Sequence, residues 1–198
     1  MINFLLAVLS AILLGSSWPH TGSLSPLIFI AFVPLLLLQK NLSDTKHAGT
    51  KFFFWVWLSL ALWNLWATGW LWRVEGSTGT KLFSMLSPSL ANSLVMTLPF
   101  ILYHKAKNLL NSFQAATALL VAWLAYEYFH LNWEFTWPWL ELGNVFSNRT
   151  SWVQWYQYTG VHGGSLWVIL CNLFAFRAYL RFKADTPWKG PTLGFVFT

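Results

Sequence analysis

The chain has 198 residues, of which 56% are apolar, 19% aromatic and only 9% charged. An ordinary soluble domain carries about 25% charged residues, so this composition excludes a water-soluble globule, and its high hydrophobicity excludes a disordered chain. The formal net charge is +6, but the cations stand beside apolar runs, which indicates a membrane surface and not nucleic acid as the partner.

Six apolar stretches approach the length of about 20 residues that a helix needs to cross a bilayer. They are 2–18, 24–38, 52–72, 82–103, 113–129 and 161–179. Continuous apolar runs do not alternate as barrel strands do, so we predict an all-α fold, a polytopic transmembrane bundle of about six helices. The first two stretches are the shortest, and Pro26 and Pro34 in the second allow a partly re-entrant hairpin.

A basic cluster follows the sixth stretch, and a short apolar run at 192–198 follows this cluster. We therefore divide the chain into a transmembrane bundle, 1–182, and a tail, 183–198, which is expected to be the truncated start of a seventh helix. This pattern is consistent with a fragment of a longer protein.

Lysine and arginine are distributed unevenly between the loops. The segments 39–51, 104–112 and 177–189 hold nine of them, whereas the alternate loops hold Arg73, Lys81 and Arg149. The positive-inside rule then predicts that both ends of the chain are cytoplasmic. The longest outer segment, about 133–160, is rich in Trp and Tyr.

Small residues recur at helical spacing in three stretches, as expected of helix interfaces in lipid. Ser89, Ser93 and Thr97 repeat in the fourth stretch. In the fifth, the stripe consists of Ala115, Ala118, Ala122 and Ala125. In the sixth, the small residues are Gly164, Cys171, Ala175 and Ala178.

Glu127 is an ionisable residue inside or at the end of the fifth stretch, where its insertion is costly. With His130 and Glu134 it forms an i, i+3, i+7 set. A carboxylate-bridged metal site needs a second Glu-x-x-His and two more carboxylates, which the sequence lacks, so we predict no metal and no cofactor. Glu127 is expected to pair with a neighbouring helix or to lie at the membrane boundary, with contact to substrate as the alternative.

Tryptophans supply the other candidate lipid-facing residues. Trp63, Trp66 and Trp70 share a face of the third stretch, where Trp63 and Trp66 either pack in the core or line a lipid-accessible cavity. Trp137 and Trp139 belong to the outer segment, whose aromatics suit lipid headgroups or acyl chains. The single cysteine, Cys171, lies within the sixth stretch without an acid or base one turn away, so it is predicted to pack, and no catalytic residue is assigned.

Five motifs give the chain a recognisable pattern. They are WNLxxTGWLW at 63–72, EYFHLNW at 127–133, WPWLxLGN at 137–144, WVQWY at 152–156 and YTGVxGGSLW at 158–167, where x marks a position outside the pattern. On these motifs the chain resembles the N-terminal membrane portion of apolipoprotein N-acyltransferases of the Bacteroidetes type. The resemblance covers essentially all of the chain.

The resemblance implies a bacterial inner-membrane enzyme that moves an acyl chain from a phospholipid to the N-terminal diacylglyceryl-cysteine of a lipoprotein. In the family, the reaction uses a Glu-Lys-Cys triad in a periplasmic nitrilase-like domain, inserted after the seventh membrane helix. No residue of this sequence matches that triad, and Cys171 does not substitute for its cysteine. The 198 residues alone are therefore expected to be inactive, with the triad supplied by a continuation of the gene or by a separately encoded nitrilase-like domain.

Two other functions compete with this one. A non-enzymatic lipid-binding or scaffolding membrane protein would keep the bundle without the chemistry. A small transporter is less well supported, because transporters pair interrupted helices in related halves and no second proline-broken pair follows the first.

Overall fold

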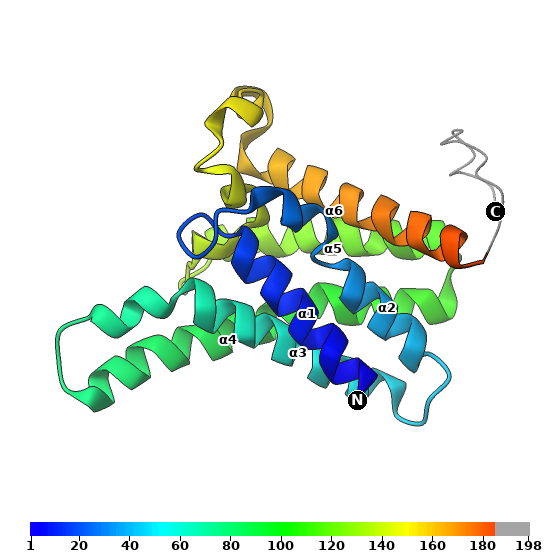
Figure 1. The fold of residues 1–198 in the computed structure, drawn as a ribbon, viewed down its shortest axis with the longest axis horizontal. Helices are drawn as coiled ribbons and strands as arrows, with labels where there is room; N and C mark the ends of the chain where they lie inside the picture. The colour runs from blue at the N-terminus through cyan, green and yellow to red at the C-terminus, as the bar shows by residue number, and fades with distance from the viewer. Residues whose placement is uncertain (185–198) are drawn as a thin grey trace.

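Each predicted apolar stretch is helical in the computed structural model, which describes residues 1–184 (Figure 1). The α-helices are α1 (Ile2–Ser17), α2 (Val33–Leu42), α3 (Ala48–Ala67), α4 (Thr78–Leu109), α5 (Ser112–Leu131) and α6 (Tyr156–Lys183). Short 3-10 helices connect them: η1 (Ser25–Ile30), η2 (Gly69–Arg73), η3 (Pro138–Leu140), η4 (Leu142–Phe146) and η5 (Thr150–Trp152). Residues 1–184 contain no strand, which confirms the all-α prediction. The predicted start of a seventh helix lies outside the described residues.

Three segments are long and apolar enough to cross a membrane by length and composition: Ser25–Leu42, α4 and α6. At about 1.5 Å per residue, the 32 residues of α4 extend about 48 Å, which exceeds a hydrocarbon core of about 30 Å. The third stretch differs from its prediction of one helix over 52–72. The α-helix ends at Ala67, and η2 follows after Thr68, whose hydroxyl donates to the carbonyl of Asn64 at 2.7 Å.

The second stretch is broken between η1 and α2, with a proline in the first turn of each helix. Lipid cannot satisfy the backbone groups that such a break exposes. Instead, Asn172 of α6 accepts a hydrogen bond from the Phe32 N–H at 2.7 Å and donates one to the Ile28 carbonyl at 2.8 Å. Ser10 of α1 donates to the Ala31 carbonyl at 2.7 Å. The break is therefore held from both sides by neighbouring helices.

The connections between helices lie at two opposite ends of the bundle (Figure 1). The turns at 43–47 and 110–111 and the end of α6 lie on the right of the view, and those at 18–24, 68–77 and 132–155 lie on the left. We call these the basic end and the aromatic end, after the residues that each carries. The Lys- and Arg-rich loops thus lie together at one end, and the loops with few cations lie together at the other.

The core is aromatic where α2, α4 and α5 meet. Phe32, Phe100 and Trp123 are fully buried, and their ring centroids lie 4.9–5.8 Å apart. Edge-on and tilted contacts of this kind add about 0.5–1.5 kcal/mol per pair beyond burial. This cluster fixes α5 against the broken second stretch.

The small-residue prediction is correct for α4, whereas on α5 it fails at Ala125. Ser89, Ser93 and Thr97 are fully buried, and α4 packs against α3 and α5. On α5, Ala125 is exposed, and the buried face consists of Ala115, Leu119, Trp123, Glu127 and His130. Trp123, Glu127 and His130 of this face have partners inside the bundle.

Candidate functional site

A groove of about 610 Å³ opens at the aromatic end of the bundle, between α4 and the segment that follows α5. We call it the aromatic groove. Its lining consists of Ser87, Pro88, Ala91, Asn92, Val95, His130, Trp133, Phe135, Thr136 and Trp137. Its volume falls within the range of about 300–1,000 Å³ of small-molecule sites, which are also mostly apolar with a few polar groups.

The polar wall of the groove is a hydrogen-bond network centred on Asn92 of α4. Its Oδ1 accepts from the Tyr126 hydroxyl at 3.1 Å and lies 2.8 Å from Nε2 of His130. Its Nδ2 donates to Oδ1 of Asn64 on α3 at 2.8 Å. One amide thus joins α3, α4 and α5 directly beneath the groove.

His130 is fixed in one tautomer by its two partners. The Trp133 indole, which can only donate, donates to Nδ1 at 2.6 Å. The proton of the neutral ring therefore lies on Nε2 and is donated to Asn92. Both ring nitrogens are occupied, and no group of three or more metal-ligating side chains occurs in residues 1–184.

Glu127 is 1% exposed and connects α5 to the outer segment. Its Oε1 accepts from the Trp123 indole N–H and from the Leu142 backbone N–H, each at 2.9 Å. Its Oε2 is buried and makes no hydrogen bond, and the Ser165 side chain lies close to the carboxyl. The carboxyl therefore holds the first residue of η4 against α5. We predicted that Glu127 pairs with a neighbouring helix, and its partner there is this 3-10 helix.

Glu141 is the second buried carboxyl of this region. Burial, and then the negative charge of Glu127, raise the pKa of the Glu141 carboxyl from 4.5 to about 7. Its Oε1 also has no hydrogen-bond partner. Its environment therefore favours the protonated carboxyl up to a higher pH than is usual for a glutamate.

The outer segment is also attached closely to the start of α6. Gly143 donates from its N–H to the Ser165 hydroxyl at 3.0 Å, and its carbonyl accepts from the Tyr156 hydroxyl at 2.9 Å. A Cβ at Gly143 would collide with the Val161 carbonyl oxygen. At Gly160, φ is +64°, a left-handed conformation that favours glycine, and the chain turns there into the long part of α6.

The structure separates the candidate tryptophans into two groups. Trp63 is fully buried and packs edge-on against Trp18, with ring centroids 5.3 Å apart. The Trp66 ring packs directly on Gly15 of α1, although 44% of the side chain is exposed. Neither residue lines the aromatic groove.

The other three tryptophans meet at the aromatic end. Trp70 and Trp139 contact each other edge-on, with ring centroids 5.7 Å apart, and Trp139 lies 6.5 Å from Trp137. Trp137 lines the groove, and its Nε1 is buried without a hydrogen-bond partner. This group therefore forms a continuous aromatic surface beside the groove.

Sequence reasoning missed Asn92 and Ser165 as members of the site. The signal for Asn92 was an amide inside an apolar stretch, one position before the small residue Ser93. Ser165 had no such signal, because its role depends on Gly143, which is 22 positions away.

Comparison of the chain with known proteins identifies its family. Residues 10–174 match the family described as apolipoprotein N-acyltransferase N-terminal domain. The chain is 31% identical over 180 residues to the apolipoprotein N-acyltransferase of Chlorobaculum tepidum, which covers 90% of this chain and 32% of that protein. It is 29% identical over 206 residues to the one of Geobacter metallireducens, with 98% and 37% covered. The chain thus spans about a third of the length of these relatives, and no solved structure gives a significant match.

Proposed function

Because this chain belongs to the apolipoprotein N-acyltransferase family, we propose that it forms the membrane part of an enzyme that acylates lipoproteins. The donor is a phospholipid, and the acceptor is the α-amino group of the diacylglyceryl-cysteine at the lipoprotein N-terminus. The aromatic groove is proposed to hold an acyl chain of one of these substrates beside the reaction site.

The unpartnered indole N–H of Trp137 is the observation that supports this role best. A buried donor without an acceptor costs about 1–3 kcal/mol, and this one lies in the wall of the groove. An ester carbonyl of a bound lipid would accept its hydrogen bond, while Trp133, Phe135 and Val95 would contact the acyl chain.

We further propose that the 198 residues alone do not form an acyl-enzyme. A thioester requires a cysteine thiolate and a base that activates it. The one cysteine, Cys171, lies in α6, and no charged residue or histidine occurs within four positions on either side of it. The nitrilase-like domain, encoded in the same gene or separately, would supply the triad.

The proposed orientation follows from the two ends of the bundle. The basic end carries Lys40, Lys46 and Lys51 and the cations around the α4–α5 turn. By the positive-inside rule it would face the cytoplasm of a bacterial inner membrane. The aromatic groove would then open near the periplasmic surface, where the nitrilase-like domain of the family acts.

The groove is tested with a phospholipid that carries a photoreactive group in its acyl chain. We expect the wild-type protein to be labelled on peptides 85–97 and 130–138. Ala91 lines the groove, so A91W should abolish this labelling. L94W is the matched control, because Leu94 is on the same helix, is 45% exposed and does not line the groove.

The activity is tested with a chimera in which residues 1–182 replace the corresponding part of the Chlorobaculum tepidum relative. We expect the chimera to restore lipoprotein N-acylation in cells depleted of their own enzyme. The 198-residue chain alone should yield no hydroxylamine-sensitive acyl label from labelled phospholipid. A chimera that binds lipid and folds without restoring acylation would favour the scaffolding function instead.

A further inference from the structure

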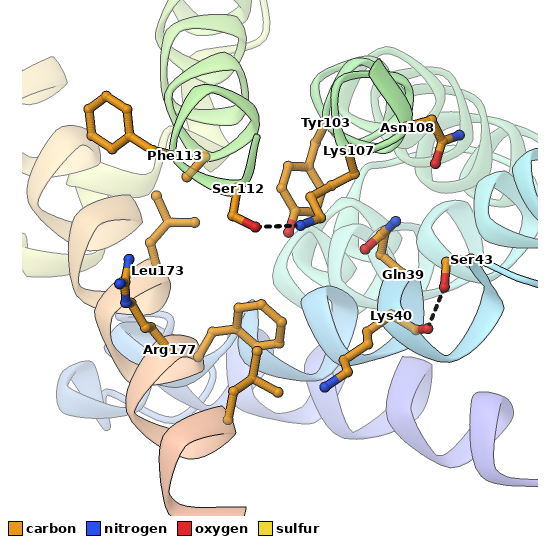
Figure 2. A pocket seen from close by; sticks show the side chains of 13 residues that line it. Gln39, Lys40, Ser43, Tyr103, Lys107, Asn108, Ser112, Phe113, Leu173 and Arg177 are labelled. Atoms are coloured by element: carbon orange, nitrogen blue, oxygen red, sulfur yellow. Dashed lines mark hydrogen bonds between the residues drawn. The ribbon is translucent and has the colours of Figure 1, made fainter. Parts of the chain in front are cut away.

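A second cavity, of about 510 Å³, lies at the basic end of the bundle, where α2, α4, α5 and α6 come together. Figure 2 shows it between Lys107 of α4 on one side and Arg177 of α6 on the other, with Lys40 of α2 below. We call it the basic cavity. From Ser112 to Leu131, α5 extends about 30 Å, and this helix separates the basic cavity from the aromatic groove.

The charges around the basic cavity have one sign. Lys40, Lys107 and Arg177 line it, and no acidic residue is among the described residues that do. Lys107 donates to the neutral Ser112 hydroxyl at 2.9 Å, so this contact leaves its positive charge uncompensated. The Tyr103 side chain also lines the cavity, and its hydroxyl is a further hydrogen-bond donor.

Apart from Arg177, the α6 side of the cavity is apolar. Leu173, Phe176 and Leu180 of α6 line it, and they follow one another at helical spacing. All three are half-buried. The cavity therefore presents cations and hydroxyls beside an apolar strip, which complements the anionic phosphate and the acyl chain of a phospholipid.

We propose that the basic cavity binds the phosphate-containing headgroup of an anionic phospholipid. Its phosphate would lie between Lys107 and Lys40, and one acyl chain would follow the apolar strip on α6. Basic pockets between membrane helices commonly bind such headgroups. Free phosphate could bind the same cations, but it has no apolar part that would contact the strip on α6. We therefore favour the lipid. This site does not rest on the proposed acyl transfer, because it lies at the other end of the bundle.

The test compares binding of phosphatidylglycerol to the 198-residue protein in phosphatidylcholine nanodiscs, by lipid photolabelling and native mass spectrometry. Each cation near a headgroup contributes about 1 kcal/mol, so K107Q should weaken binding about fivefold and K40Q together with K107Q about thirtyfold. Ala116 also lines the cavity, so A116F should block binding without changing the charge. K105Q is the matched control, because Lys105 is exposed on the same helix and does not line the cavity.

The proposal is supported if K107Q and A116F both lose binding while K105Q retains it. Equal losses in K105Q and K107Q, with normal binding by A116F, would show general surface attraction and overturn it. Competition by inorganic phosphate as effective as that by the lipid would identify a phosphate site and overturn the lipid assignment. Equal binding of phosphatidylglycerol and phosphatidylcholine would also overturn it.

Discussion

Replacement of Glu127 by alanine should detach the outer segment from the bundle. The Glu127 carboxyl accepts hydrogen bonds from the Trp123 indole and the Leu142 backbone through a single oxygen. E127A leaves both donors buried and unpaired, at about 1–3 kcal/mol each, so the free energy of unfolding should fall by about 2–6 kcal/mol. E127Q keeps an acceptor oxygen at the same position and should stay within about 1 kcal/mol of the wild type.

Unfolding in mixed micelles, followed by tryptophan fluorescence during titration with a denaturing detergent, measures these differences. Limited proteolysis reports on the outer segment separately, and E127A should become cleavable within 138–146 before the helices unfold. Val121, 57% exposed on the same helix, supplies the control V121A. If E127Q destabilises the protein as much as E127A, or if E127A matches V121A, the anchoring role of the carboxyl is refuted.

Three other predictions use the same unfolding measurement. N172L removes both hydrogen bonds to the break in the second stretch and should cost about 2–5 kcal/mol; a loss below about 0.5 kcal/mol would contradict this role for the amide. G143A, whose Cβ would collide with a backbone carbonyl, should cost about 1–3 kcal/mol, whereas G69A, which has open space, should stay within about 0.5 kcal/mol. Because folded Glu141 has a pKa near 7 and the unfolded carboxyl one of 4.5, unfolded Glu141 loses its proton at lower pH, so stability should fall as the pH rises from about 5 through 7. E141Q should flatten this dependence, and an unchanged slope would exclude Glu141 as its source.

The sequence predicted the helices well because their signal is local. Runs of about 20 apolar residues are sufficient to identify helices in lipid, and Pro34 indicated that the second stretch is irregular. The exact position of the break could not be predicted, because the partner of Phe32 is Asn172, 140 positions away. A side chain that satisfies a distant backbone group leaves no periodic pattern in the sequence.

The site was predictable in its residue types but not in its pairing. Glu127 stood out as an ionisable residue in an apolar run, yet its bond to the Leu142 N–H depends on how η4 folds back on α5. Trp63 and Trp70 share a helix face in the sequence pattern, but α3 ends between them, at Ala67. This end of the helix separates a core residue from one at the aromatic end.

The bond between Asn172 and the break in the second stretch also has a consequence for biosynthesis. A ribosome releases residues 25–42 into the membrane long before it makes residue 172, so during most of translation the exposed amide and carbonyl at Phe32 and Ile28 have no Asn172 to pair with. The break between η1 and α2 can form these two hydrogen bonds only after α6 has been made. Until then, of the two helices that hold the break, only α1, through Ser10, is in place.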